Sequence, residues 1–193
     1  MRVLAVHAHP VPESYGRALF EAAVETLRAG GHEVDALDLY AEGFAPAMDA
    51  DERRRHNVPG PNRRGLEPDI ARLERTEALV LVYPTWWFGM PAMLKGWFDR
   101  VWMPGVAFDL DAETITPRLT RIRKLTVITT YGSPWWVVNL WLMRADRRIV
   151  AGFRRLLHPN CTQEWLALYR LDTATDAARS AFLERVRRSL ARL

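Results

Sequence analysis

The chain has little cysteine and no long hydrophobic run, and each absence excludes classes of protein. Cys161 is the only cysteine among 193 residues, so an intramolecular disulfide and any multi-cysteine metal or redox motif are excluded, which fits a cytoplasmic protein. We expect its thiol to be buried and inert. The longest apolar candidate, residues 135–143, is broken by Asn139 and followed by Arg144, so it cannot supply the ~20 residues that span a bilayer. The short apolar run at residues 2–7 is typical of a strand and not of a signal peptide.

Two familiar nucleotide-binding motifs are absent as well. Neither GxGxxG nor GxxxxGK[ST] occurs, which disfavours a Rossmann dinucleotide fold and a P-loop NTPase. The net charge of +4 comes largely from arginine pairs that are scattered among acidic residues. They do not form the contiguous basic groove with interleaved aromatics that nucleic-acid binding requires. A modest positive field would still attract anionic ligands such as dinucleotides.

Apolar runs alternate with helical patterns along the whole chain, which favours one α/β domain over residues 1–193. Between them, residues 40–68 form a polar, arginine-rich excursion that could hold one helical turn. The economical arrangement is a flavodoxin-like, doubly wound, five-stranded parallel sheet of order 2-1-3-4-5. The predicted strands are 2–7, 33–39, 78–83, 125–130 and 162–169, and the predicted helices are 14–29, 69–76, 91–101, 137–157 and 175–193.

The segment 83–108 mixes tryptophans with turn residues. It holds four of the eight tryptophans and interrupts them with prolines and glycines, which a core strand or core helix does not need. Such a mixture suits a turn that presents flat apolar surface and backbone N–H groups to a planar ligand, before a helix begins at Pro91. The turn follows a buried strand, and ligands bind at the carboxyl ends of strands in open α/β sheets.

Three loops should converge at this edge of the sheet, namely residues 7–15, 84–89 and 129–134. The first leads into a helix whose N-terminus would attract phosphate. Ser14 is either the N-cap of that helix or a ligand contact. His7 alternates with the apolar residues of its strand and is expected to be buried, so His9 is the better functional candidate.

The second and third loops each have a plain structural alternative. At least one of the consecutive aromatics Trp86, Trp87 and Phe88 should line a cleft or a subunit interface, unless the three form a hydrophobic plug. In the third loop, Gly132 would allow close backbone approach to a ligand, or belong to an ordinary turn.

The longest motif is Trp87 to Val101, which reads WFGMPAMLKGWFDRV. With this block, the chain is identified as a member of the flavodoxin-like NAD(P)H:quinone oxidoreductase family. That family includes DT-diaphorase-type enzymes, bacterial drug-activity modulators and ancillary reductases of potassium-efflux systems. Weaker shared elements are Ala8-His9-Pro10 with Ser14, the turn 105–108, and Thr129-Thr130.

The resemblance implies a noncovalent flavin, FAD with FMN as the alternative, and two-electron transfer from NADH or NADPH to a quinone or similar acceptor. It also implies a cytoplasmic homodimer with its active site near the subunit boundary, to which exposed aromatics at Trp97, Trp102, Trp135, Trp136 and Trp141 would contribute. Position by position, His9, Ser14, Tyr15 and Ala18 would hold the flavin pyrophosphate; Pro84, Thr85, Trp86, Trp87 and Phe88 would wall the isoalloxazine; and Thr129, Thr130, Tyr131 and Gly132 would contact its far edge.

The chain departs from the family in two places. Gly16 stands where many relatives have asparagine, so one phosphate-side contact is missing or replaced. Trp136 and Leu142 stand where mammalian-type enzymes carry a tyrosine and a histidine thought to stabilise charge on the reduced flavin. The candidate replacements are Tyr131 and Arg144, with Asn139 as a further candidate. We hypothesise that backbone donors of residues 86–88 carry most of the charge stabilisation.

Two further functions stay open at this point. The protein could be a flavin-binding regulatory subunit of a membrane transporter, in which reductase activity is secondary. It could also be a flavodoxin-like scaffold that has lost its cofactor, since the tyrosine–histidine relay is missing.

Overall fold

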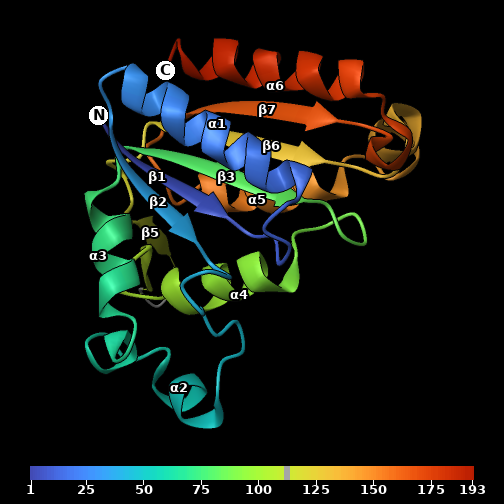
Figure 1. Ribbon diagram of the computed structural model, residues 1–193. Helices are drawn as coiled ribbons and strands as arrows, with labels where there is room; N and C mark the ends of the chain where they lie inside the picture. The colour runs from blue at the N-terminus through green and yellow to red at the C-terminus, as the bar shows by residue number, and fades with distance from the viewer. Residues whose placement is uncertain (111–113) are drawn as a thin grey trace.

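A five-stranded parallel sheet forms the centre of the molecule (Figure 1). The structure is a computed structural model and describes residues 1–110 and 114–193. The strands lie in the order β2-β1-β3-β6-β7, and all neighbouring pairs are parallel. This confirms the predicted flavodoxin-like order 2-1-3-4-5, which counts these five strands alone. They are β1 (Arg2–His7), β2 (Glu33–Asp38), β3 (Ala78–Pro84), β6 (Lys124–Thr130) and β7 (Thr162–Leu168).

Helices cover both faces of the sheet, with α1 and α6 on one side and α3, α4 and α5 on the other (Figure 1). The central strands are apolar on both sides for this reason. In β1, Val3 and Ala5 pack toward α1 and α6, whereas Leu4 and Val6 pack into the opposite layer. The helices are α1 (Tyr15–Ala29), α2 (Ala50–Arg55), α3 (Glu67–Arg75), α4 (Ala92–Val101), α5 (Ala145–Arg154) and α6 (Asp176–Leu190).

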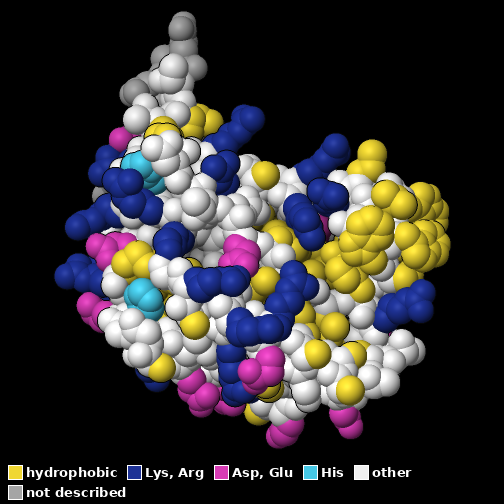
Figure 2. All heavy atoms as spheres, turned by 90° about the horizontal axis from the view of Figure 1, so that it is seen from above, with side chains coloured by type: hydrophobic (Ala, Val, Ile, Leu, Met, Phe, Trp, Pro, Cys, Tyr) yellow, Lys and Arg dark blue, Asp and Glu magenta, His cyan; other side chains and the backbone are white. Residues whose placement is uncertain are grey.

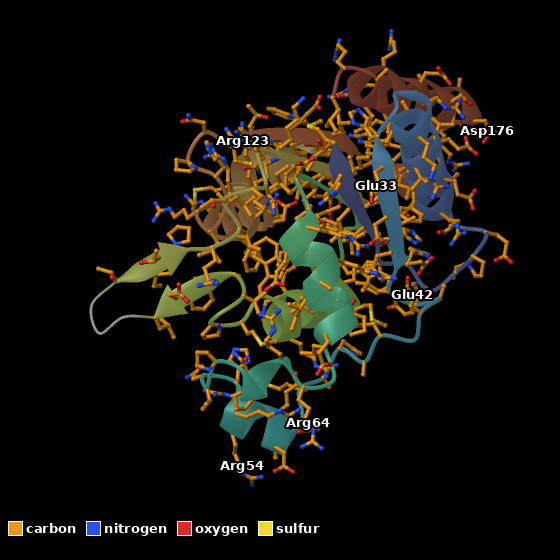
Figure 3. All side chains as sticks on the ribbon, turned by 90° about the vertical axis from the view of Figure 1, so that its left-hand side faces the viewer. Glu33, Glu42, Arg54, Arg64, Arg123 and Asp176 are labelled. Carbon is orange, nitrogen blue, oxygen red and sulfur yellow. The ribbon has the colours of Figure 1, made fainter. Side chains whose placement is uncertain are left out.

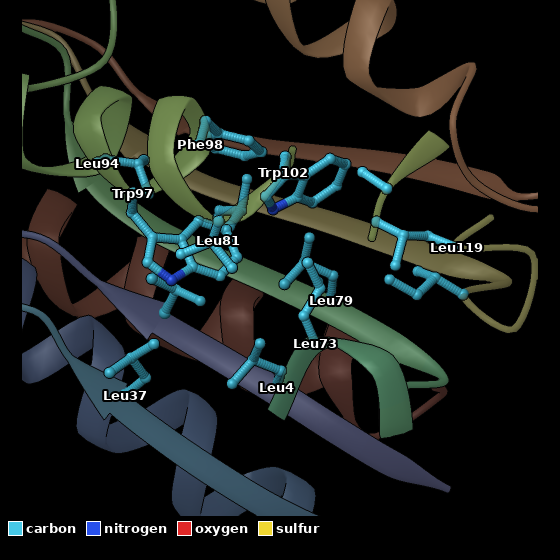
Figure 4. Packing of buried hydrophobic residues seen from close by; sticks show 14 of the residues in the cluster. Leu4, Leu37, Leu73, Leu79, Leu81, Leu94, Trp97, Phe98, Trp102 and Leu119 are labelled. Atoms are coloured by element: carbon cyan, nitrogen blue, oxygen red, sulfur yellow. The ribbon is translucent and has the colours of Figure 1, made fainter. Parts of the chain in front are cut away.

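Helix α4 buries two of the tryptophans that the sequence suggested for an interface. Trp97 is 0% exposed and Trp102 is also buried, and their rings lie 6.1 Å apart (Figure 4). Both pack in the core layer that contains Leu79 and Leu81 of β3. The prediction that these two residues supply exposed aromatic surface is therefore wrong, because the inner side of α4 faces the sheet.

The excursion after β2 is more ordered than the sequence suggested, since it contains α2 and the short helix η1 (Pro61–Arg63). Buried Glu52 of α2 accepts a hydrogen bond from Arg100 Nε of α4 at 2.7 Å. Buried Asn62 donates to the carbonyl of Pro104 at 2.8 Å. These contacts fasten the excursion to the domain. Arg54 and Arg64 lie on it, far from Arg123, as expected for scattered arginines (Figure 3).

The predicted helix 137–157 is wrong in its first half. Residues Val137–Trp141 form a π-helical turn, η2, in which Leu142 N–H bonds the carbonyl of Val137 at 2.9 Å. Met143 and Arg144 then adopt positive φ values of 47° and 57°, and α5 begins only at Ala145. The break lets the chain turn buried Asp146 inward while Arg144 and Ala145 stay exposed. The apolar run suggested helical continuity, but it could not reveal this polar anchor.

Smaller features complete the fold. A two-stranded antiparallel pair, β4 (Phe108–Leu110) and β5 (Ile115–Pro117), was not predicted. It follows the turn at Gly105, whose φ of 79° suits glycine. The thiol of Cys161 is buried as expected, and burial raises its pKa. Within residues 1–110 and 114–193, no helix combines the length and apolar character needed to cross a bilayer.

Candidate functional site

The three loops singled out in the sequence meet at the carboxyl edge of β1, β3 and β6. The rings of His9 and Trp86 lie 6.1 Å apart, which joins the first loop to the second. The hydroxyls of Thr85 and Thr129 are 2.9 Å apart, and Thr85 N–H donates to the carbonyl of Thr130 at 2.9 Å. Contacts between distant parts of the chain therefore assemble one site from three loops.

The first loop presents hydrogen-bond donors at the N-terminus of α1. Ser14 Oγ accepts from Arg17 N–H at 3.1 Å, so Ser14 is the N-cap. No described residue accepts from the N–H groups of Tyr15 or Gly16. His9 Nδ1 lies 3.1 Å from Val11 N and 3.3 Å from the Val11 carbonyl oxygen, so Nε2 is the ring nitrogen that remains to face a ligand. This end of α1 therefore suits an anionic group.

Two other predicted cofactor-binding residues, Tyr15 and Ala18, already use polar groups in contacts within the protein. Tyr15 donates its hydroxyl to the carbonyl of Arg179 at 2.6 Å and so ties α1 to α6. Burial raises the pKa of Tyr15 to about 12, so this hydroxyl stays protonated. Ala18 is exposed in the first turn of α1 and its N–H is already bonded to the carbonyl of Ser14.

A partly buried polar cluster lies behind this loop. His7 Nδ1 lies 3.1 Å from Asp38 Oδ2, which also accepts from Arg17 Nη1 at 2.7 Å. Burial lowers the pKa of His7. Burial acts to raise the pKa of Asp38, but hydrogen bonds from the Ala41 N–H and from His7 outweigh it, so that pKa is lowered. These residues and His9 line a cleft of about 520 Å³.

The second loop is a strained two-residue turn. Trp86 and Gly89 exchange both backbone hydrogen bonds at 3.1 Å, and the central residues Trp87 and Phe88 have φ values of 49° and 57°. Bulky residues rarely adopt this left-handed conformation, and such strain concentrates at functional sites. No described residue accepts from the N–H of Trp87 or Phe88. The turn therefore offers two backbone donors beside an indole that is 97% exposed.

In the third loop, buried Thr129 and Thr130 end β6. Tyr131 is buried and uses all of its polar groups internally: its hydroxyl donates to Asp146, its N–H to Leu168, and its carbonyl accepts from Leu171. Burial raises the pKa of Tyr131, so the hydroxyl is a donor and not a base. A Cβ at Gly132 would lie 2.6 Å from Asp172 Oδ2, so a side chain approaches this glycine closely even without a ligand.

The segment after Gly132 exposes a cluster of large apolar side chains. We call Trp135, Trp136, Leu140, Trp141 and Met143 the aromatic patch; all are more than half exposed. Figure 2 shows hydrophobic side chains gathered at one end of the molecule, with Lys and Arg side chains beside them. Arg144, one of the predicted catalytic residues, is exposed next to the patch. Asn139 is buried beneath it and donates to the carbonyl of Trp135 at 2.9 Å and to Tyr169 Oη at 3.1 Å.

Two buried polar residues near the site escaped the sequence analysis. Asp146 accepts from Tyr131, and Tyr83 has a buried hydroxyl with no partner among the described residues. Burial first, and then the nearby Asp146, raise the pKa of Tyr83. Asp146 stands in an arginine-rich run that is typical of a solvated helix face, so no sequence signal marked it.

Comparison with known families agrees with this arrangement. A sequence model for the flavodoxin-like fold matches residues 1–139. The chain belongs to this family. Rat NAD(P)H dehydrogenase [quinone] 1 is 34% identical over 148 residues, which cover 68% of this chain but 54% of that protein. The chain thus spans about half the length of curated relatives such as this one, and the family resemblance inferred from the central block is confirmed.

Solved structures extend the similarity over nearly the full length of both this chain and the matched protein. An NAD(P)H:quinone oxidoreductase from Methanothermobacter marburgensis is 30% identical, with a TM-score of 0.82 over 99% of this chain and 98% of that one. A Bacillus anthracis FMN-dependent NADH-azoreductase in complex with FMN has a TM-score of 0.79 over 99% and 98% of the two chains, at 15% identity. The second likeness shows the fold alone.

Proposed function

We propose that this protein is a flavin-dependent oxidoreductase that passes two electrons from NADH or NADPH to a quinone or similar acceptor. The names of the relatives support the nicotinamide donor and the quinone acceptor. The observation that carries the flavin is the strained turn Trp86–Gly89, which directly follows the Thr85 hydrogen bond to the end of β6 and has two N–H groups with no partner among the described residues. Strain of this kind is retained where the site needs the geometry.

The residues present fit such a cofactor. The N–H groups of Tyr15 and Gly16, together with His9, would hold its phosphate end, and Gly16 leaves the space in front of them without a side chain. Ser14 and Tyr15 would shape this end by capping and anchoring α1, and Ala18 would border it. Pro84, Thr85 and Trp86 to Phe88 would wall the ring, and Thr129 to Gly132 would border its far edge.

Held by these residues, a flavin would supply hydride transfer between the nicotinamide donor and the acceptor, and one proton from solvent would balance the reduction of a quinone to its hydroquinone. The chain supplies orientation and charge stabilisation. The N–H groups of Trp87 and Phe88 would stabilise negative charge at the ring edge. Trp87 would offer an apolar face to a planar acceptor.

The two predicted catalytic residues receive different roles. The hydroxyl of Tyr131 is buried against Asp146, so we assign Tyr131 to positioning. Arg144 is exposed beside the aromatic patch, so we assign it to contact with the acceptor, where its guanidinium could stabilise developing negative charge.

We further propose a cytoplasmic homodimer with its active site near the subunit boundary, in which Trp135, Trp136 and Trp141 meet a second copy on one side and border the acceptor site on the other. The support is the size of the exposed aromatic patch, which a monomer would keep in water at a cost. The relatives named above give no support to the alternative of a transporter subunit.

Mass spectrometry of small molecules released by heating the purified protein tests the cofactor. We expect a flavin, FAD by the family resemblance, with FMN as the other outcome. A colourless protein that binds neither flavin when titrated would refute the proposal and favour a scaffold without cofactor. A flavin-loaded protein that oxidises neither NADH nor NADPH with quinones present would instead point to a regulatory flavoprotein.

A further inference from the structure

We propose that Asp146 is a positioning residue for the acceptor side of the site and acts on the aromatic patch through Tyr131. The inference rests on the proposed function and adds a residue that no motif in the sequence marks. It predicts that Asp146 governs selectivity between large and small acceptors although it touches neither.

The first step concerns the buried carboxylate. Asp146 is 2% exposed, and its Oδ2 accepts the Tyr131 hydroxyl while its Oδ1 accepts Arg147 N–H at 2.9 Å. A buried carboxylate is tolerated only with such donors, and losing one leaves a costly unsatisfied group. Breaking the Asp146–Tyr131 hydrogen bond would therefore cost stability.

The second step concerns the chain between these two partners, which is the aromatic patch itself. Val138 packs against Tyr131 in a small buried cluster, and Asn139 donates to Trp135 O and Tyr169 Oη. The Tyr131 and Tyr169 rings stack in parallel at 5.0 Å. The patch thus has a hydrogen-bonded underside and an exposed upper side. The Tyr131–Asp146 hydrogen bond joins the two ends of the segment that carries it.

The third step concerns where the Tyr131–Asp146 hydrogen bond, which we call the clamp, lies in the molecule. Tyr131 directly follows Thr129 and Thr130, which border the proposed ring site, and Figure 1 shows the segment beyond the carboxyl ends of β6 and β7. An acceptor larger than the ring it stacks on would reach the patch, whereas a single-ring quinone would not. Displacing the patch by about 1 Å can cost as much as ~100-fold in rate for a substrate that depends on it.

The test uses the flavin-loaded full chain with Asp146→Leu and Tyr131→Phe, each assayed with a polycyclic quinone and with benzoquinone. For Asp146→Leu we expect KM for the polycyclic quinone to rise roughly tenfold, KM for benzoquinone to change less than about twofold, and flavin affinity to hold. Tyr131→Phe should shift the ratio of the two KM values in the same direction. Hydrogen–deuterium exchange should quicken in residues 135–145 and stay unchanged in β1 and β3. Asp146→Asn keeps an acceptor for the tyrosine and should restore most of the selectivity.

Ser189→Ala is the matched control, because it removes another largely buried side-chain hydrogen bond, to Glu164, in a different part of the molecule. It should lower stability and leave the KM ratio unchanged. The inference is overturned if both clamp variants affect the two quinones equally, or if they shift the ratio no more than Ser189→Ala does. Tyr131→Phe keeps the ring volume and answers the question should Asp146→Leu not fold. Wild-type protein without flavin or turnover would refute the proposed function instead.

Discussion

Two groups of tryptophans behave in opposite ways in this molecule. Trp97 and Trp102, on and just after α4, are buried in the core, whereas Trp87, Trp135 and Trp141 are exposed, Trp141 to 77%. The regular helix turns one side toward the sheet and removes its indoles from water. The exposed group lies on or just before irregular backbone, namely a strained turn and a π-helical turn, and that π-helical turn buries Val138 and Asn139 instead of its tryptophan.

This difference teaches that backbone regularity, more than residue type, separates tryptophans of the core from those of the site. Burying an aromatic side chain of a helix stabilises the fold through the hydrophobic effect. An exposed aromatic side chain on strained backbone gives no such stabilisation to the protomer, and therefore indicates a ligand or a partner. The following predictions test that separation, from the largest expected effect to the smallest.

Trp97→Ala should lower the free energy of unfolding by about 3–5 kcal/mol, because it opens a cavity in the core. Trp141→Ala should change the free energy of unfolding of the isolated protomer by less than about 0.5 kcal/mol, because its burial in the proposed dimer does not enter that quantity. Urea denaturation of both variants measures the contrast. Similar losses in the two would mean that the exposed group is also part of the protomer core.

Trp136→Glu combined with Trp141→Glu should convert the proposed dimer into a monomer, since each charge would be buried in an apolar interface and aromatic anchors can contribute ~2 kcal/mol or more. Light scattering at micromolar protein measures the mass. Ala29→Glu serves as the control, because it places a negative charge on an exposed residue at the C-terminus of α1, outside the patch, and it should leave the mass unchanged. A wild-type monomer would contradict the dimer.

Trp87→Asn with Phe88→Gly should stabilise the fold by about 1 kcal/mol, because Asn-Gly suits a turn with two positive φ values. The same double variant should weaken flavin-dependent turnover, since the exposed indole is lost. Trp87→Ala removes the indole but keeps the strain, so it should reduce turnover without the gain in stability. Thermal denaturation and steady-state kinetics separate the two effects; a destabilised double variant would show that the turn is not strained.

Stability should fall as pH drops below ~6.5, the ordinary pKa of histidine. Burial lowers the pKa of native His7, so the unfolded chain takes up a proton there before the native protein does, and acid favours unfolding. The depressed pKa of Asp38 adds a second loss at lower pH, as the native carboxylate is finally protonated. His7→Gln should flatten the first part of the profile, and Asp38→Asn the second.

The fold and the convergence of the three loops were predictable because they rest on local patterns. The apolar run of β3, the N-cap at Ser14 and the punctuated segment after Tyr83 each indicate their structure without long-range information. The carboxyl edge of a parallel sheet then brings the loops together by topology alone.

The details of the third loop were not predictable for the converse reason. Asp146 meets Tyr131 where the chain bends at Met143 and Arg144, and nothing in the apolar run 135–143 marks that bend. The burial of Trp102 likewise depends on contacts such as the one with Phe153 of α5, ring centroids 5.8 Å apart. A local sequence pattern does not show which residues far apart in the chain will come into contact.

Gly96 in the middle of α4 shows how a motif residue can depend on a distant segment. A Cβ at this position would lie 2.2 Å from the carbonyl oxygen of Pro46, so the excursion rests directly on the helix backbone. Any larger residue at Gly96 would have to appear together with a shortened or rerouted segment around Pro46. The two positions should therefore change as a pair during evolution, and a relative with a bulky residue at this point of the helix should have lost the proline contact.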